Sequence, residues 1–234
     1  MSLFFQPIFL LLQLKPIVNI HNSWVFYWLL VLSVLIVVLK ILFPKRLVDS
    51  LTGLISKKSY SRLRQDGFIP KNIVNILLTA FYIASLGLFI TAITYHFYFE
   101  KNINLSFKSA IYVTLIVAVY ISLKFSFILI SQWIYQAKEI AINYLNIIVL
   151  SYNIFGAVIF FGLWILFYLN FYLGLLMIVS ILSILFIIRL LKLAVLSEQK
   201  NNFSLFSFIV YICTVEILPL IIAQKLYFNW VLAV

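Results

Sequence analysis

The chain has 234 residues, of which 65% are hydrophobic and 10% are charged, and its net charge is +11. Soluble domains carry about 25% charged residues, so a soluble chain of this composition would lack the polar surface to cover itself. The Lys and Arg residues lie between apolar runs rather than in a compact basic domain, which excludes a nucleic-acid-binding protein.

Residues 1–23 are the first segment in chain order, and the apolar run within them is short. Pro7, Gln13, Lys15 and Pro16 interrupt or follow this run, whereas a membrane-spanning helix needs about 20 apolar residues. No basic residue precedes the run and no small-residue cleavage site follows it, so no secretory signal is indicated. We expect residues 1–23 to form a short outer or interfacial segment.

Six apolar runs that are long enough to cross a bilayer follow, and together they predict an all-α polytopic membrane bundle over residues 24–226. Each run must satisfy its own backbone hydrogen bonds in lipid, and a helix does so. Residues 227–234 then form a short outer tail. The predicted spans are 24–43, 73–97, 110–130, 144–169, 174–193 and 205–223.

The loop 44–72 is the only sizeable polar stretch between the predicted spans. Apolar residues recur in it at helical spacing and basic residues follow, which predicts a short helix lying on the inner leaflet. The basic residues could be a plain topology signal, a contact for anionic lipid headgroups or a docking site for a partner. The apolar residues are Leu47, Val48, Leu51, Leu54 and Ile55, and the basic ones are Lys57, Lys58, Arg62 and Arg64.

The distribution of charge predicts the orientation of the spans. Of the 17 Lys and Arg residues, 13 fall on the side of the loop 44–72, Lys124 and Arg189 among them. The positive-inside rule places that side in the cytoplasm. We therefore expect a protein of the bacterial inner membrane with both termini in the periplasm. Aromatic residues near the predicted outer ends, such as Trp24 and Tyr172, agree with an interfacial belt.

The predicted sixth span contains an acid, Glu216, three residues before Pro219. An ionisable group at this depth costs about 2.5–3.5 kcal/mol on insertion scales, so it should face the bundle. Lys124 is the best candidate partner. The two side chains could form a structural ion pair or hydrogen bond, or a proton or ion relay. Alternatively, Lys124 extends to the cytoplasmic interface and Glu216 is protonated.

The predicted fourth span carries a polar stripe. Glu139, Asn143, Asn146 and Asn153 fall within about 80° of one another on a helix, and Gly156 lies slightly farther round. Such side chains usually form hydrogen bonds between membrane helices, and a small residue allows close approach. The stripe could therefore hold helices together, or it could line a polar cavity.

Motifs for enzymes, metals and cofactors are missing from the sequence. It contains no nucleophile elbow, zinc-protease motif, phosphate-binding loop or dinucleotide fingerprint. The single cysteine, Cys213, precludes an intramolecular disulfide. His21 and His96 fall near predicted outer ends, where an interfacial role is expected rather than metal binding. We expect no cofactor and no metal. An enzyme is the less favoured class, although missing motifs do not exclude an intramembrane enzyme.

Several segments resemble one family of membrane proteins. The segment from Tyr211 to Leu220, YICTVEILPL, is similar to that family's YxCTxEILPL signature, and weaker similarities lie at 43–46, 123–124 and 152–156. The family comprises uncharacterised multi-pass membrane proteins of Bacteroidota, catalogued as domain of unknown function 4271. The resemblance implies an inner-membrane location. It matches motif positions without assigning them roles, namely Lys124, Asn153, Gly156, Cys213, Glu216 and Pro219.

Two functions agree with these observations. The first is a structural or assembly subunit of an envelope complex, acting through helix packing and the basic loop on membrane-protein partners or a second copy. The second is a small transporter, channel or proton-conducting element that uses Glu216, Lys124 and the asparagine stripe. The few intramembrane polar groups and the lack of an internal repeat favour the first.

Overall fold

The computed structural model of the chain describes residues 23–65, 69–98, 107–135 and 138–198, and these ranges are helical without any strand. The all-α prediction is therefore confirmed for this part of the chain. In chain order the elements are α2 (Ser23–Leu42), α3 (Pro44–Thr52), α4 (Lys57–Gln65), the 3-10 helix η1 (Ile69–Lys71), α5 (Ile73–Tyr98), α6 (Phe107–Tyr135), α7 (Lys138–Tyr168) and α8 (Phe171–Glu198).

Five of these helices are long and apolar enough to cross a membrane. They are α2, α5, α6, α7 and α8, and they coincide in position with the first five predicted spans. This confirms a polytopic helical bundle. The predicted sixth span, 205–223, lies outside the described residues, as do the terminal segments 1–22 and 227–234.

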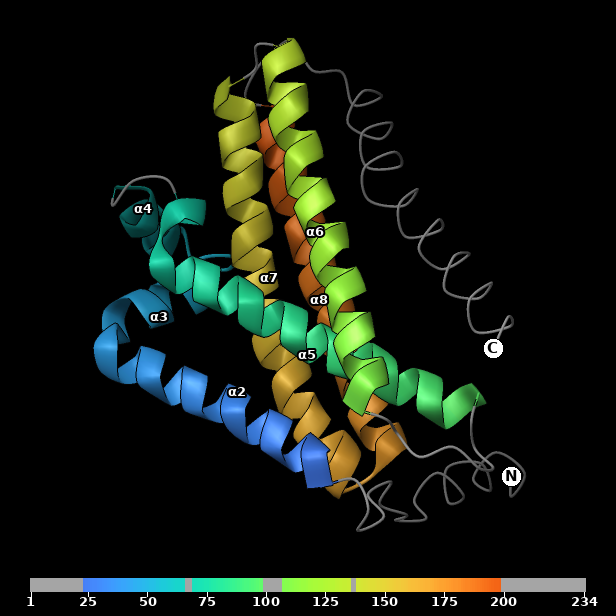
Figure 1. Cartoon of the computed structure of the whole chain (residues 1–234). Coiled ribbons are helices and arrows are strands. Elements are labelled where there is room, and N and C mark those ends of the chain that lie inside the picture. The colour runs from blue at the N-terminus through green and yellow to red at the C-terminus, as the bar shows by residue number, and fades with distance from the viewer. Residues whose placement is uncertain (1–22, 66–68, 99–106, 136–137, 199–234) are drawn as a thin grey trace, which may run out of the picture.

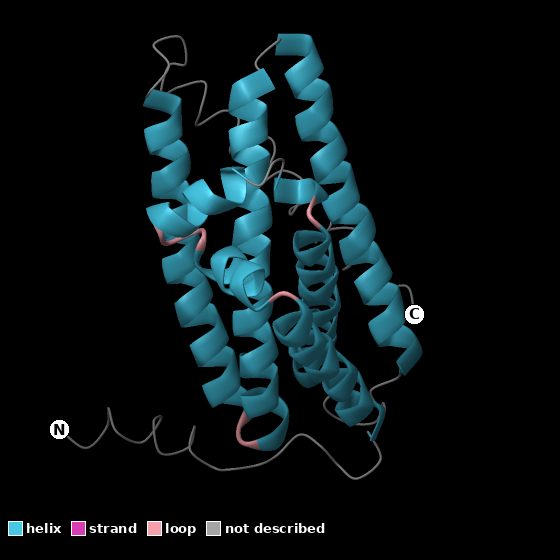
Figure 2. Cartoon of the chain, turned by 90° about the vertical axis from the view of Figure 1, so that its left-hand side faces the viewer, coloured by secondary structure: helices cyan, strands magenta, loops and turns pink. Residues whose placement is uncertain are grey.

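Helix α7 is the centre of the bundle. It packs against α5, α6 and α8, and 72% of its most apolar window is buried, compared with 22% for α2 and for α8. The three long helices α6, α7 and α8 stand roughly parallel, with α7 packed against both of the others, and α2 and α5 run obliquely to them (Figures 1 and 2). The outer faces of α2, α6 and α8 are left to contact lipid or partner proteins.

The three long helices extend beyond the apolar runs that predicted them. α6, α7 and α8 contain 29, 31 and 28 residues. At 1.5 Å per residue each is more than about 40 Å long, whereas the hydrocarbon layer is about 30 Å thick. The predicted spans ended where polar residues began, but the helices continue through those residues. The surplus length must be taken up by tilt or by projection from the membrane.

Two glycines allow the helices to approach closely. A Cβ at Gly156 would lie 3.0 Å from the Cα of Tyr82 on α5, and one at Gly174 would lie 2.6 Å from the Cα of Leu166 on α7. Next to Gly156, the rings of Tyr82 and Tyr152 stack with centroids 4.7 Å apart. The close approach expected at Gly156 is therefore present, between α7 and α5.

Aromatic side chains gather where α5 ends and α8 begins. The His96 ring stacks on Phe171 with centroids 3.8 Å apart, and its Nε2 lies 3.3 Å from the hydroxyl of Tyr172. At the same end of the bundle, Trp24 lies edge-to-face with Phe107, with centroids 5.7 Å apart. His96 thus ties two helices together at the end predicted to lie outside.

The loop 44–72 forms two helices and a 3-10 turn, so the prediction of one short helix is wrong in this detail. The apolar residues from Leu47 to Ile55 were predicted to lie on one helix, but α3 ends at Thr52, so Leu54 and Ile55 lie in the connection to α4. Leu47 and Leu54 are buried, whereas Ile55 is exposed. Ser56 directly precedes α4 and its hydroxyl accepts a hydrogen bond from the Ser59 N–H at 3.4 Å, which starts the second helix.

Candidate functional site

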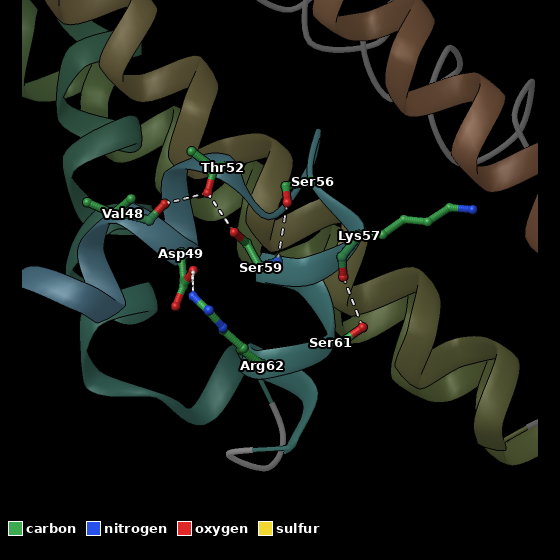
Figure 3. Close-up of polar contacts among 8 residues, drawn as sticks. All are labelled: Val48, Asp49, Thr52, Ser56, Lys57, Ser59, Ser61 and Arg62. Atoms are coloured by element: carbon green, nitrogen blue, oxygen red, sulfur yellow. Dashed lines mark hydrogen bonds and ion pairs between the residues drawn. The ribbon is translucent and has the colours of Figure 1, made fainter.

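Helices α3 and α4, residues 44–65, fold into one unit that we call the basic module (Figure 3). The Thr52 hydroxyl of α3 lies 3.0 Å from the Ser59 hydroxyl of α4. Arg62 Nη1 lies 3.7 Å from Asp49 Oδ1, and the Arg62 side chain is 56% exposed. Such an exposed pair contributes about 0–1 kcal/mol, so it orients α4 on α3 more than it stabilises the fold.

The basic side chains predicted in this region are on the surface of α4. The helix, KKSYSRLRQ, contains no acid, and all four cations are exposed. In Figure 3 the Arg62 side chain points to Asp49, whereas Lys57 extends away from α3. The four residues are Lys57, Lys58, Arg62 and Arg64.

The connection that follows the basic module is joined to the middle of the bundle by two hydrogen bonds in series. Asn153, the middle residue of α7, donates from Nδ2 to Asn75 Oδ1 at 2.8 Å. Asn75 in turn donates from Nδ2 to the carbonyl of Ile69 in η1 at 2.9 Å. Both asparagines are at most 1% exposed. α3 itself also packs against α7.

Two of the three predicted stripe asparagines are deeply buried. Asn153 is 0% exposed and Asn146 is 2% exposed, whereas Asn143 is half-buried. The Oδ1 atoms of Asn146 and Asn153 have no hydrogen-bond partner among the described residues. A buried acceptor left in this state costs about 1–3 kcal/mol, so the stripe is only partly satisfied by the described helices.

Two cations are buried inside the predicted spans. Lys124 on α6 is 6% exposed and Arg189 on α8 is 3% exposed. Each belongs to the buried stripe of its helix, since Ile121 and Ile128 flank Lys124, and Leu185 and Leu193 flank Arg189. The protein therefore covers both side chains, and Arg189 lies within the predicted span 174–193.

These cations lie near one level of the bundle. Lys124 is 11 residues from the end of α6, and Arg189 is 9 residues from the end of α8. Asn146 is 8 residues from the start of α7. With a rise of 1.5 Å per residue, all three are about 12–17 Å from the shared end of these helices. We call Lys124, Asn146 and Arg189 the inner polar layer.

The remaining predicted site residues lie outside the described part of the chain. Glu216 and Pro219 belong to residues 199–234, and the side chain of Glu139 is likewise outside the description. The pairing of Glu216 with Lys124 stays a prediction. Among the described residues, no group of three or more His, Cys, Asp or Glu side chains could hold a metal ion.

Sequence reasoning missed Asn75 and did not single out Arg189. Asn75 is the third residue of α5. An asparagine in the first turn of a helix usually has a local role, so its sequence position does not predict a buried partner on another helix. Arg189 follows Leu185 by four residues and precedes Leu193 by four, but α8 is apolar on all sides, so this spacing does not identify its buried face.

A bundle of long apolar helices with buried polar groups and a basic surface unit defines a multi-pass integral membrane protein. Residues 25–227 match the family described as Domain of unknown function (DUF4271), and the chain belongs to that family. No curated protein and no solved structure matches the chain.

Proposed function

We propose that the protein is a structural or assembly subunit of a bacterial envelope complex. It lies in the inner membrane with the basic module in the cytoplasm and both termini in the periplasm. One observation carries the proposal. The connection beside the basic module is fixed to the central helix through Asn153, Asn75 and the Ile69 carbonyl, while the cations of α4 remain exposed.

A fixed basic surface supports an assembly role because it presents its charges in one orientation. Complementary charge then selects a partner and fixes the register of docking. The membrane-facing surfaces also suit helix partners, since large apolar side chains on α2, α6 and α8 are exposed. Ile41 is 73% exposed, Phe127 is 64% exposed and Leu176 is 67% exposed.

Affinity purification of the tagged full chain from native membranes tests this proposal. We expect envelope proteins to co-purify in stoichiometric amounts. Changing Lys57, Lys58, Arg62 and Arg64 together to glutamine should reduce their recovery by more than about tenfold, because each surface cation contributes about 1 kcal/mol to an anionic contact.

The matched control removes the same charge from the opposite side. Lys15, Lys101, Lys108 and Lys225 are changed together to glutamine, and this variant should retain its partners. Purification of the wild-type chain without any stoichiometric protein, or equal losses in the two variants, would contradict the proposal.

A transport or proton-conducting role is the second candidate, and the buried cations favour it. Ionisable residues inside a membrane are functional candidates by default, and Lys124 and Arg189 are both within spans. The assembly role predicts a different result. Liposomes containing the wild-type chain should show no pH-driven flux above empty liposomes, and Glu216→Gln should lower protein yield only. Flux that Glu216→Gln abolishes at normal expression would establish the second candidate.

A further inference from the structure

One face of α4 is distinct from the face that meets α3. Tyr60, Ser61, Arg64 and Gln65 line an open depression of about 390 Å³. At 100° per residue these four positions share one side of the helix, and Lys57 falls on the same side one turn earlier. Arg62 lies on the other side, where it pairs with Asp49.

We propose that this face of α4 binds the phosphate of an anionic phospholipid headgroup in the adjoining membrane leaflet. The inference rests on the proposed function in one respect, because it takes the basic module to be the protein's cytoplasmic docking surface. It adds the chemical class of one ligand and the residues that select it.

The connections of the module place this face where two spans, α2 and α5, end. α3 begins two residues after the span α2 ends, and α5 begins two residues after η1. Two spans therefore leave the membrane at the module. Val48 and Ile55 are 59% and 57% exposed on the same unit. Exposed apolar side chains beside cations are typical of a segment that lies in the membrane interface.

The chemistry of the face suits a phosphate. The guanidinium of Arg64 can donate two parallel hydrogen bonds to phosphate oxygens, and the Gln65 amide supplies a further donor. The Tyr60 side chain forms part of the wall of the depression, but its hydroxyl is buried, so the donors that a phosphate can reach are those of Arg64 and Gln65.

Among the described residues, the charges on this face of α4 are positive. α4 contains no acid, and Asp49 is turned toward Arg62 on the opposite side. Lys57 extends away from α3 (Figure 3) and adds a second cation on this side of α4, and opposite charges at short range attract.

Spin-labelled lipids and the full chain in nanodiscs test the proposal. Phosphatidylglycerol is compared with phosphatidylcholine, which carries the same phosphodiester without net charge, and the readout is the fraction of motionally restricted lipid. We expect a preference for phosphatidylglycerol that Arg64→Gln lowers about fivefold. Arg62→Gln removes the same charge from the same helix and should lower the preference less than about twofold, since its partner is Asp49.

Three results would overturn the proposal. Equal losses in Arg62→Gln and Arg64→Gln would indicate a diffuse basic surface, and equal restriction of the two lipids would indicate no headgroup selection. Displacement of spin-labelled phosphatidylglycerol by inorganic phosphate would identify free phosphate as the preferred ligand. None of these results depends on the co-purification of protein partners. A wild-type chain that co-purifies with no stoichiometric protein but keeps its lipid preference would contradict the assembly role alone.

Discussion

Gly174→Ala should destabilise the bundle by about 1–3 kcal/mol, the usual cost of overpacking a close contact. The added Cβ would lie 2.6 Å from both the backbone N and the Cα of Leu166. Backbone atoms cannot rotate away, so α8 would have to move off α7. Alanine is otherwise favoured over glycine in a helix by about 1 kcal/mol, so a loss of stability must come from the contact.

Gly162→Ala is the matched control on the same pair of helices. Its Cβ would overlap Cγ1 of the buried Ile178 side chain and lie 2.5 Å from its Cδ1, while the Ile178 Cβ would remain 3.5 Å away. Side-chain atoms can shift farther than backbone atoms, so we expect a smaller loss than for Gly174→Ala. Reversible unfolding in mixed micelles measures both variants. Unchanged or increased stability of Gly174→Ala would show that α7 and α8 do not approach closely at this point.

The positions of the five described spans could be predicted because a long apolar run in a bilayer satisfies its backbone hydrogen bonds by forming a helix. Their ends could not be predicted as well. α6 begins at Phe107 rather than residue 110, and α8 continues to Glu198 rather than 193. Apolar composition predicts the stretch of a helix that contacts lipid. The helix itself can continue past that stretch for as long as its backbone hydrogen bonds continue.

The buried faces were harder to predict than the spans. These helices are apolar on all sides, so hydrophobic periodicity does not identify the side that faces inward. Polar residues identified it on α7, where Asn146 and Asn153 are buried. Arg189 entered the prediction only through the charge count, which does not distinguish a buried cation from an exposed one. Only tertiary packing shows that its stripe faces the bundle.

The pairing of Asn75 with Asn153 shows why part of the site was beyond sequence reasoning. The two residues are 78 positions apart, on α5 and α7. Nothing local to Asn75 predicts a partner, since it lies in the first turn of its helix. The oblique course of α5 brings this first turn to the middle of α7 (Figure 1). Glu216 and the sixth span stay predictions.

Asn75→Ala should cost about 2–3 kcal/mol, more than Asn153→Ala. It removes the bond from Asn153 and the bond to the Ile69 carbonyl, and it leaves two buried groups unpaired at about 1 kcal/mol or more each. Asn153→Ala removes only the first bond. Besides lower stability in mixed micelles, we expect Asn75→Ala to speed amide hydrogen exchange in residues 44–71, because η1 loses its link to the bundle.

Asn170→Ala is the control that separates a local release from general destabilisation. Asn170 is also buried, and its Oδ1 accepts hydrogen bonds from the N–H groups of Tyr172 at 2.9 Å and Leu173 at 3.2 Å. Its loss should cost about 1 kcal/mol at the start of α8, without faster exchange in the basic module. If Asn75→Ala and Asn170→Ala speed exchange there equally, the asparagine pair does not hold the module.

A double-mutant cycle then isolates the contact between Asn75 and Asn153. Hydrogen bonds between membrane helices average about 0.6 kcal/mol and reach about 1.7 kcal/mol, and this pair should lie in the upper part of that range because both residues are buried. A coupling energy near zero would mean that each asparagine acts alone. The fixed orientation of the basic module, on which the assembly role depends, would then need another cause.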